Sequence, residues 1–578
     1  MITNARPVPA TRVLCAGLTL LALLTNGCSG SGSTSSLPGT AHAAAPAAPT
    51  SSARFVIRVP VRNAPAAAAK RAPAYISAAT QSITVAVTGP TTLNQTANLT
   101  PASTGCQSTS GMTTCTLTLA LSPGNYSASL TTYDAANGTG NVLSADQNVA
   151  FTVVSGQANT VALILNGVPA QLLMVPLTAA AISTGVASFK LSGAFPASMQ
   201  ATALDIDGNI IVGPGSPAFT VAQTGGNPYF ILPAPASPNV FMLIPPVGNG
   251  VTTSFTLTAA YGDGTCSRSG AVCTTTFTAT THQQTMIVDN DGPVTVLPYP
   301  YQTHTSLAGY GSSAGLPGVA AFDSAGNLWI GDNSAGDVKE YAPPYTGSPV
   351  TSIGDGTLQD VIPVVMSPAG NLFVGGFNNN AVYEYAPPYT GAPRTITNGI
   401  SGPASLAFDA AGDLFVANFT GNNVTEYVPP YTGAPVTLGS LAQALEVAAS
   451  AGGDVFAIGP GANSIALFVP PYSSESSITS DTSAVSALAV GPDGTTLFAG
   501  QSGFSRIDTY VPPYSSVAIS TANQTAASPA EFAFDAAADL FSADQGNNRV
   551  TIYAPPYTGT PLLVTSGVSQ PTGVYISP

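Results

Sequence analysis

Aspartate and asparagine recur near the ends of short strand-like segments in the second half of the chain. Their carboxylate and amide oxygens could bind a cation or a hydroxyl-rich ligand if these segments bring them to one face. The alternative is structural, because Asn and Asp also hydrogen-bond turn backbones and tolerate left-handed conformations. We favour the structural role and keep these residues as candidate ligand-facing positions. They are Asp332, Asn333, Asn378, Asn418, Asn423, Asp544, Asn547 and Asn548.

Groups that usually perform catalysis are scarce in this sequence. Residues 311–315 (Gly-Ser-Ser-Ala-Gly) match the G-x-S-x-G nucleophile elbow, but that motif needs a strand-turn-helix context, and here it lies between β-type segments. His304 lies nearby, yet the whole chain has only 3 histidines. Without a cluster of histidines and acidic residues, the sequence predicts no catalytic site, no metal and no cofactor.

Four of the 6 cysteines form two closely spaced pairs, Cys106 with Cys115 and Cys266 with Cys273. Each pair flanks a turn rich in small and polar residues, so we predict a disulfide across a hairpin in each case. Zinc is the alternative, but no paired histidines accompany these cysteines. Disulfides persist in oxidising compartments, which predicts that the protein works outside the cytoplasm.

Residues 1–28 have the features of a targeting segment. A start with two arginines precedes an apolar stretch at residues 13–24, which is too short to span a membrane. The segment resembles a bacterial lipoprotein signal with Cys28 as the lipidated residue, although Thr25 stands where that family has leucine. The resemblance implies a lipid anchor, and Ser29 after the cysteine implies the outer membrane if the bacterium has one. Cleavage at a small residue without lipidation is the alternative.

Residues 29–74 predict a flexible tether, because they are rich in Ala, Pro, Ser and Gly. A short alternating strand interrupts this composition at residues 54–61. Lys70 and Arg71 could contact anionic lipid, although simple solvation of their charges also explains them.

The overall composition predicts an all-β protein. Charged residues make up only 7% of the chain and the net charge is −14, which leaves no basic surface for nucleic acid. Hydrophobic residues make up 44%, which excludes global disorder, and 58 glycines and 50 prolines argue against long helices.

Residues 75–166 and 168–282 each contain a run of short alternating segments separated by turn signals. Both runs resemble the immunoglobulin-like sandwiches of bacterial surface proteins. In the second run the spacing of Asp205, Asp207 and Asn209 could suit calcium. We favour a hairpin turn there, because the glycine and the later glutamate of a calcium loop are missing.

A Pro-Pro-Tyr element sets the period of residues 283–578. Its tyrosines recur every 41 to 44 residues, and Tyr301 lies one period before the first full copy. Each period holds four short β-type segments, the unit of a β-propeller blade. The tyrosines could stack on sugars, but we favour a role in fixing corners and packing blade against blade. They are Tyr345, Tyr389, Tyr431, Tyr472, Tyr514 and Tyr557.

Two copies of the period, residues 322–332 and 541–550, resemble the NHL-repeat family, and residues 415–418 also resemble the related YVTN propellers. The resemblance implies a β-propeller fold but names no ligand. The chain ends on a first strand at residues 572–577, and residues 286–290 match a second strand.

We therefore predict that these two segments pair and close a seven-bladed ring with the C-terminal strand. The alternative is a six-bladed ring in which residues 283–296 belong to the preceding sandwich.

Together these features predict an all-β lipoprotein of the cell surface, with two immunoglobulin-like sandwiches followed by a β-propeller. The propeller is expected to be a non-catalytic binding or scaffolding platform for a cell-wall, glycan or protein ligand. The lipid anchor is expected to attach the protein to the membrane. One alternative is a secreted propeller hydrolase or lyase acting on sugars or lactones. Another is a passive structural surface protein.

Overall fold

The computed structural model describes residues 51–61, 76–109, 111–226, 230–233, 239–244, 250–261, 265–268, 270–290, 292–310, 319–354, 356–479, 484–515, 517–520 and 528–578. Three predictions from the sequence lie outside the described residues. They are the signal with Cys28, the basic pair Lys70 and Arg71, and the Gly-Ser-Ser-Ala-Gly segment at 311–315.

The described residues form an all-β protein, as predicted. Their helical content is limited to short 3-10 turns, and none of their helices is long and apolar enough to cross a membrane. The 3-10 turns are η1 (Ala136–Gly138), η2 (Gly213–Gly215), η3 (Thr265–Ser267) and η4 (Gln545–Asn547).

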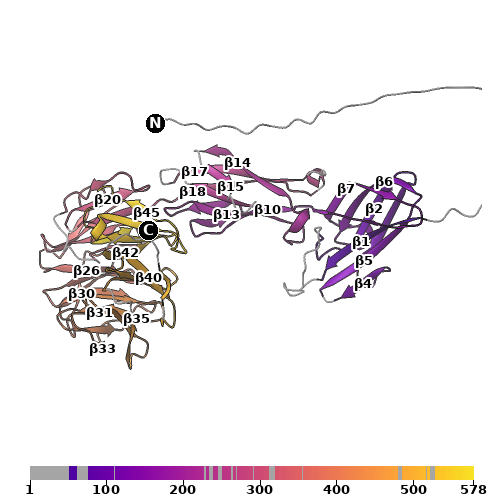
Figure 1. Cartoon of the computed structure of the whole chain (residues 1–578). Helices are drawn as coiled ribbons and strands as arrows, with labels where there is room; N and C mark the ends of the chain where they lie inside the picture. The colour runs from indigo at the N-terminus through magenta and orange to yellow at the C-terminus, as the bar shows by residue number, and fades with distance from the viewer. Residues whose placement is uncertain are drawn as a thin grey trace, which may run out of the picture. The chain divides into compact units, whose positions relative to one another are not determined.

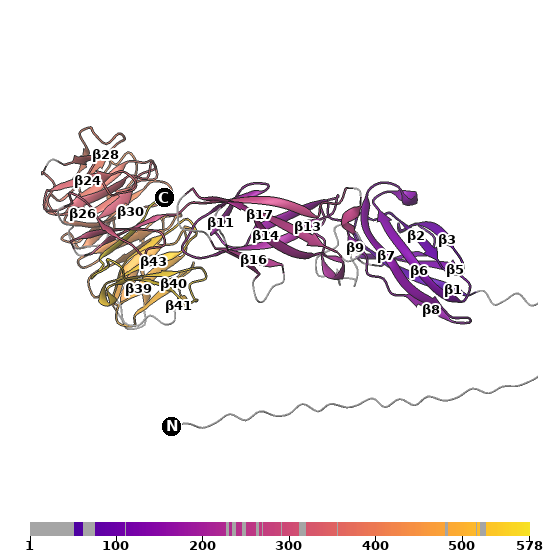
Figure 2. The same ribbon diagram turned by 90° about the horizontal axis from the view of Figure 1, so that it is seen from above.

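The first folded unit consists of two sheets that share one apolar core. Alternate residues of the strands point into this core, where Phe55, Ile83 and Leu130 are fully buried. Figure 2 shows the neighbouring strands of the larger sheet side by side. In spatial order the smaller sheet is β4 (Cys106–Thr109), β5 (Met112–Ala120), β1 (Ser52–Pro60) and β8 (Ala158–Val161). The larger sheet is β3 (Leu93–Asn98), β2 (Ser82–Thr88), β6 (Gly124–Tyr133), β7 (Val142–Val153) and β9 (Asn166–Gly167).

Strand β1 corrects the predicted boundary between the tether and the first sandwich. Composition predicts that residues 54–61 belong to the tether and that the domain begins at residue 75. In the structure β1 pairs along its whole length with β5 and also with β8. It belongs to this sheet because its alternate residues, Phe55 and Ile57 among them, are buried in the core.

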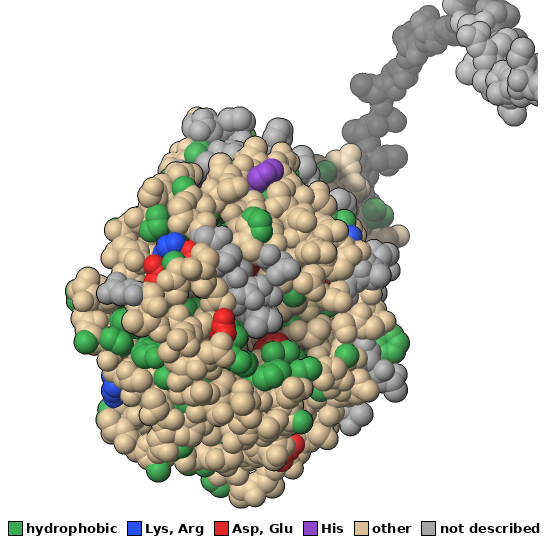
Figure 3. Space-filling view, turned by 90° about the vertical axis from the view of Figure 1, so that its left-hand side faces the viewer, with side chains coloured by type: hydrophobic (Ala, Val, Ile, Leu, Met, Phe, Trp, Pro, Cys, Tyr) green, Lys and Arg blue, Asp and Glu red, His purple; other side chains and the backbone are tan. Residues whose placement is uncertain are grey.

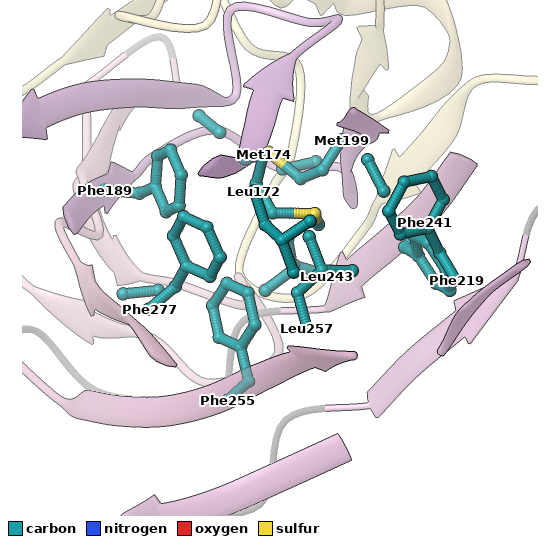
Figure 4. Close-up of a cluster of buried hydrophobic side chains, with 14 of the residues drawn as sticks. Leu172, Met174, Phe189, Met199, Phe219, Phe241, Leu243, Phe255, Leu257 and Phe277 are labelled. Carbon is teal, nitrogen blue, oxygen red and sulfur yellow. The ribbon is translucent and has the colours of Figure 1, made fainter. Parts of the chain in front are cut away.

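The second folded unit also has two sheets around one core. Its phenylalanines stack, with ring centroids of Phe189, Phe255 and Phe277 separated by 5.7–6.4 Å (Figure 4). One sheet is β10 (Gln171–Pro176), β13 (Ala197–Leu204), β16 (Val240–Ile244) and β15 (Phe230–Pro233). The other is β11 (Ala181–Gly185), β12 (Ser188–Leu191), β18 (Thr274–Thr281), β17 (Thr252–Ala260) and β14 (Ala218–Gly226).

Both predicted disulfides are present. Cys106 and Cys115 face each other across the paired strands β4 and β5. Cys266 in η3 is bonded to Cys273, which immediately precedes β18. Each bond closes a short loop in one sandwich.

The rest of the described chain is a β-propeller built from antiparallel sheets of four strands (Figure 1). Within each of the first three sheets that are continuous in sequence, the strands lie in chain order. These sheets are β22 (Ala320–Phe322), β23 (Leu328–Asp332), β24 (Asp337–Tyr341) and β25 (Thr351–Ile353), then β26 (Val361–Met366), β27 (Leu372–Gly376), β28 (Ala381–Tyr385) and β29 (Arg394–Ile396), then β30 (Pro403–Phe408), β31 (Leu414–Asn418), β32 (Asn423–Tyr427) and β33 (Val436–Ser440).

Three further sheets repeat this order. They are β34 (Glu446–Ala449), β35 (Val455–Ile458), β36 (Ser464–Phe468) and β37 (Glu475–Thr479), then β38 (Val485–Val490), β39 (Leu497–Gln501), β40 (Arg506–Tyr510) and β41 (Val517–Ser520), then β42 (Pro529–Phe534), β43 (Leu540–Asp544), β44 (Arg549–Tyr553) and β45 (Leu562–Val564).

One more sheet joins the two ends of this region. It contains β21 (Thr305–Ser306), β20 (Val294–Pro298), β19 (Thr285–Asp289) and the C-terminal strand β46 (Gly573–Ile576). Residues Met286–Asp289 pair antiparallel with Gly573–Ile576, so the expected pairing of these two segments is present.

The Pro-Pro-Tyr corners connect the third and fourth strands of the sheets. Six tyrosine hydroxyls each donate a hydrogen bond to a backbone carbonyl 19 residues earlier, in the turn between the first and second strands, with oxygen–oxygen distances of 2.7–3.0 Å. For example, Tyr431 donates to Gly412. Several of the rings also contact an aromatic side chain of the preceding sheet edge-on, as Tyr431 does on Phe373. The corners therefore tie each sheet internally and to its neighbour.

Candidate functional site

The turns between first and second strands use their acidic residues to hold the backbone. The Oδ1 atom of Asp323 accepts hydrogen bonds from the backbone N–H groups of Ala325 and Asn327, both at 2.9 Å. In the second sandwich Asp205 does the same for Asp207 and Asn209, at 3.0 and 2.8 Å. These contacts support the hairpin interpretation of the Asp205 segment. No group of three or more His, Cys, Asp and Glu side chains in the described part of the chain is arranged to hold a metal.

The predicted ligand-facing loops lie between second and third strands, and several of their polar side chains are buried. Asp332 has no exposed surface; its Oδ1 atom accepts N–H groups of Ser334 and Ala335, and its Oδ2 atom pairs with Lys339. Asp544 is equally buried and lies 3.0 Å from the Nε atom of Arg549. Burial raises the pKa of Asp544, while hydrogen bonds from neighbouring side chains oppose that rise.

Asn418 occupies the corresponding position of a third sheet. Its Oδ1 atom accepts the N–H of Ser401 at 2.9 Å, and its amide nitrogen donates to Asn423 at 3.0 Å and to Thr425 at 2.9 Å. Because Asn418 has no exposed surface, both ends of its amide are used within the fold.

Other asparagines in these loops join one sheet to the next. The Oδ1 atom of Asn333 accepts the N–H of Val361 at 2.6 Å, and that of Asn548 accepts the N–H of Gln570 at 2.8 Å. Asn378 donates to Asp360, which immediately precedes β26 of the same sheet, and Asn547 lies half-buried in η4. The candidate residues thus occupy equivalent loops, and the hydrogen bonds given above for them are made within the propeller.

A different set of residues surrounds a cavity of about 330 Å³. The first strand of every propeller sheet, β22, β26, β30, β34, β38, β42 and β46, contributes to its lining, so the cavity lies on the central axis and is called the channel below. Most of the residues that line it have apolar side chains, Val364, Leu406 and Phe532 among them, and polar atoms also reach its surface. Figure 3 shows a face of the molecule that carries few charges, on which hydrophobic side chains gather beside acidic ones.

One repeated position in the first strands introduces polar groups into the channel. This position lies four residues before the turn residue that follows each first strand. It is apolar in four sheets, where it is Val319, Pro363, Ala487 and Gly573, and polar in three, where it is Ser405, Glu446 and Glu531. All three polar side chains line the channel.

Glu446 is half-buried, and the exposed part of its surface faces the channel. Its Oε1 atom accepts the backbone N–H of Leu488 in the next sheet at 2.8 Å. Burial raises the pKa of Glu446 to about 8, because the charged form loses its hydration, and the Leu488 hydrogen bond opposes this only partly. Glu446 is therefore largely protonated at neutral pH.

Glu531 forms a second polar centre with Tyr575, and a hydrogen bond joins their side chains. The Tyr575 hydroxyl oxygen also accepts the backbone N–H of Val319 at 3.1 Å. Gly573 makes room for this pair, because a Cβ atom there would lie 2.5 Å from the Tyr575 hydroxyl and 2.9 Å from Oε2 of Glu531. Burial raises the pKa of Tyr575 well above its usual range, so the phenol stays neutral.

Sequence reasoning missed Glu446, Glu531 and Tyr575. The available signal was a departure from the repeat, since a glutamate stands where other periods have Val, Pro, Ala or Gly. The polar residues that recur in most periods, Asp and Asn, point to the loops between second and third strands instead.

Comparisons with known proteins find distant structural likenesses and no family. No protein-family model and no curated protein matches the chain. Among solved structures, virginiamycin B lyase from Staphylococcus aureus is similar at 13% identity and a TM-score of 0.39, over 45% of this chain and 90% of that one. A candidate 6-phosphogluconolactonase from Bacteroides fragilis has 11% identity and a TM-score of 0.41, over 51% and 98%. A functionally unknown protein from Desulfotomaculum acetoxidans has 12% identity and a TM-score of 0.41, over 51% and 99%.

These likenesses are consistent with a β-propeller. At such identities and scores they carry no argument about what this chain binds or does.

Proposed function

We propose that this protein is an extracytoplasmic lipoprotein whose propeller binds a small ligand in its channel without transforming it. In this proposal two immunoglobulin-like domains present a seven-bladed propeller, one blade for each four-stranded sheet, and Cys28 carries the lipid anchor. The two disulfides support an oxidising location.

The observation that carries the binding function is the channel itself. Its volume of about 330 Å³ falls in the range of roughly 300–1,000 Å³ typical of small-molecule sites. It combines apolar walls with a few polar groups, Glu446, Glu531 and Tyr575 among them, which is the usual composition of a site that orients a ligand. The second-to-third-strand loops support the fold instead, because their side chains hold the backbone.

Ligand-observed NMR on the full mature chain tests this function with a library of small apolar compounds. We expect a subset to bind the wild type and to be released by Ser405→Phe, which fills the channel from β30. Ser476→Phe on the exposed strand β37 is the matched control and should leave binding unchanged. Equal binding by wild type and Ser405→Phe, or no binding by any compound, would contradict a channel site.

The anchor is tested separately by labelling cells with a palmitate analogue. We expect label on the wild type and none on Cys28→Ser. Equal label on both proteins would show that another residue carries the lipid, and no label on the wild type would exclude the anchor.

A hydrolase or lyase is the second candidate, and one observation favours it. Two carboxyl groups line the same cavity, and one of them, Glu446, is held protonated, which is the arrangement a general acid requires. Incubation with a panel of lactones and glycosides separates the candidates. Turnover that Glu446→Gln abolishes would establish the enzyme, whereas binding without turnover supports the platform.

A further inference from the structure

We propose that the channel selects an apolar molecule carrying a protonated amine, with the ammonium group held between the side chains of Glu446 and Glu531. This inference rests on the proposed function, because it assumes that the channel is a binding site. It goes further by naming the chemical class of the ligand.

The charge of the channel supports a cationic ligand. Among the described residues that line it, Glu446 and Glu531 are acidic and none is Lys, Arg or His. An anionic ligand would meet only acidic groups there. A protonated amine would compensate carboxylates that lie against apolar walls, where an isolated charge is costly.

The placement of the two glutamates supports a shared ligand group. Both occupy the same repeated position of a first strand, in β34 and in β42, and a single sheet separates them. The intervening sheet contributes Leu488 to the cavity wall, and its residue at the repeated position is the small and buried Ala487. An ammonium group has three donors and can therefore serve both carboxylates at once.

The walls of the channel determine what the amine is attached to. Val364, Leu406, Phe532 and Phe534 line part of the cavity, so the ligand is expected to carry a hydrocarbon group beside its amine. The same walls disfavour a bare divalent ion, because calcium takes six to eight oxygen ligands and the described residues contain no cluster of three or more His, Cys, Asp or Glu side chains.

Glu446 adds a measurable consequence to this binding mode. Because burial keeps this carboxyl protonated at neutral pH, the approach of an ammonium group favours its ionised form and releases a proton. Glu531 and the neutral Tyr575 are the other titratable groups facing the same cavity. Binding of an amine should therefore be coupled to proton release, whereas binding of an uncharged isostere should not.

Isothermal titration calorimetry on the full mature chain tests the inference with three probes of equal length. They are hexylammonium, 1-hexanol and hexanoate, each titrated near pH 7 in two buffers of different ionisation enthalpy. We expect hexylammonium to bind about 10-fold or more tightly than 1-hexanol, with proton release, and hexanoate not to bind.

Isosteric variants assign the effect to the two carboxyl groups. Glu446→Gln and Glu531→Gln should each weaken hexylammonium by about 10- to 100-fold and leave 1-hexanol unchanged. Glu475→Gln is the matched control, since it removes the same charge from the exposed outer strand β37. Thermal melting of each variant shows whether it is folded, and proton release by the wild type is a readout that needs no variant.

Each outcome decides the question. Equal affinity for hexylammonium and 1-hexanol, with no effect of either substitution, would overturn the amine specificity and leave the channel as a site. Absence of hexylammonium binding would overturn the inference, while the compound library still tests the channel. Displacement of hexylammonium by millimolar calcium, lost in both glutamate variants, would identify an inorganic cation site instead.

Discussion

The loops between second and third strands and the first strands around the channel both carry buried polar side chains, but those side chains make different contacts. In the loops, Asp332 and Asn418 direct their polar atoms to backbone amides and to nearby polar side chains. In the channel, Glu446 uses one oxygen on the backbone and keeps surface open to a cavity. The loop residues have polar counterparts in other sheets. By contrast, the position that holds each glutamate is occupied by an apolar residue in four of the seven sheets. Polar residues that follow the repeat hold the propeller together, and the two glutamates that depart from it line the channel proposed as the binding site.

The largest expected effect breaks a loop contact. Asp544→Ala leaves the partly buried Arg549 guanidinium without its carboxylate, so we expect the free energy of unfolding to fall by about 3 kcal/mol. The fluorescence of Trp329, the single tryptophan of the chain and fully buried in β23, reports propeller unfolding in urea. Glu475→Ala on the exposed edge is the control. A change below about 0.5 kcal/mol for Asp544→Ala is the size typical of surface substitutions. Such a small change would contradict the conclusion that the polar side chains of these loops stabilise the propeller.

The next prediction concerns the channel, where a substitution is expected to raise the free energy of unfolding instead of lowering it. The pKa of Glu446 is raised to about 8, so the folded protein holds a proton that the unfolded chain gives up above the ordinary glutamate pKa. Wild-type stability therefore falls as pH rises from about 5 to about 8, by at most about 1.4 kcal/mol per pH unit from this one group.

Glu446→Gln removes this dependence. The variant should match the wild type near pH 4, gain on it through that window and stay ahead above pH 8. Urea denaturation of both proteins at each pH measures the difference, in which the other titrating groups cancel. Parallel curves across the window would show that Glu446 is not desolvated in the channel.

This contrast also explains what the sequence could reveal. The Pro-Pro-Tyr period predicts the propeller because every copy must make the same corner, and the segments at residues 286–290 and 572–577 can be matched to strands of that period. The alternating residues of β1 predict a strand but not its partners, which lie far along the chain in β5 and β8. Composition alone therefore placed β1 in the tether.

The channel could not be predicted in the same way. Glu446 and Glu531 lie in segments that resemble ordinary buried strands, and only the assembly of the first strands around one cavity shows that both side chains line it. Tyr575 belongs to the last strand, β46, and reaches this position because that strand pairs with β19. Its contact with Glu531 depends on ring closure and has no local signal in the sequence.

A smaller effect tests the corners that tie each sheet to its neighbour. Tyr431→Phe removes the hydroxyl that donates to Gly412 at 2.8 Å but keeps the ring against Phe373. We expect a loss of about 1 kcal/mol in the free energy of unfolding. Tyr431→Ala should lose more, because it also removes the aromatic contact. Urea denaturation monitored by Trp329 fluorescence measures both losses. Equal losses for the two variants would show that the aromatic ring contributes nothing to stability.

The smallest effect concerns a single exposed contact at the closing sheet. Asn548 has a φ of 52° and its Oδ1 atom accepts the N–H of Gln570 at 2.8 Å, shortly before β46 begins. Asn548→Gly keeps this left-handed backbone without strain and removes only the side chain, so we expect a loss of about 0.5 kcal/mol. Amide hydrogen exchange should become faster at Gln570 and stay unchanged at Leu488, whose N–H is held by Glu446. In Glu446→Gln we expect no change at Gln570, because that amide is held from the loop. Faster exchange at both amides in either variant would mean that loops and channel open together, and the division between them would not hold.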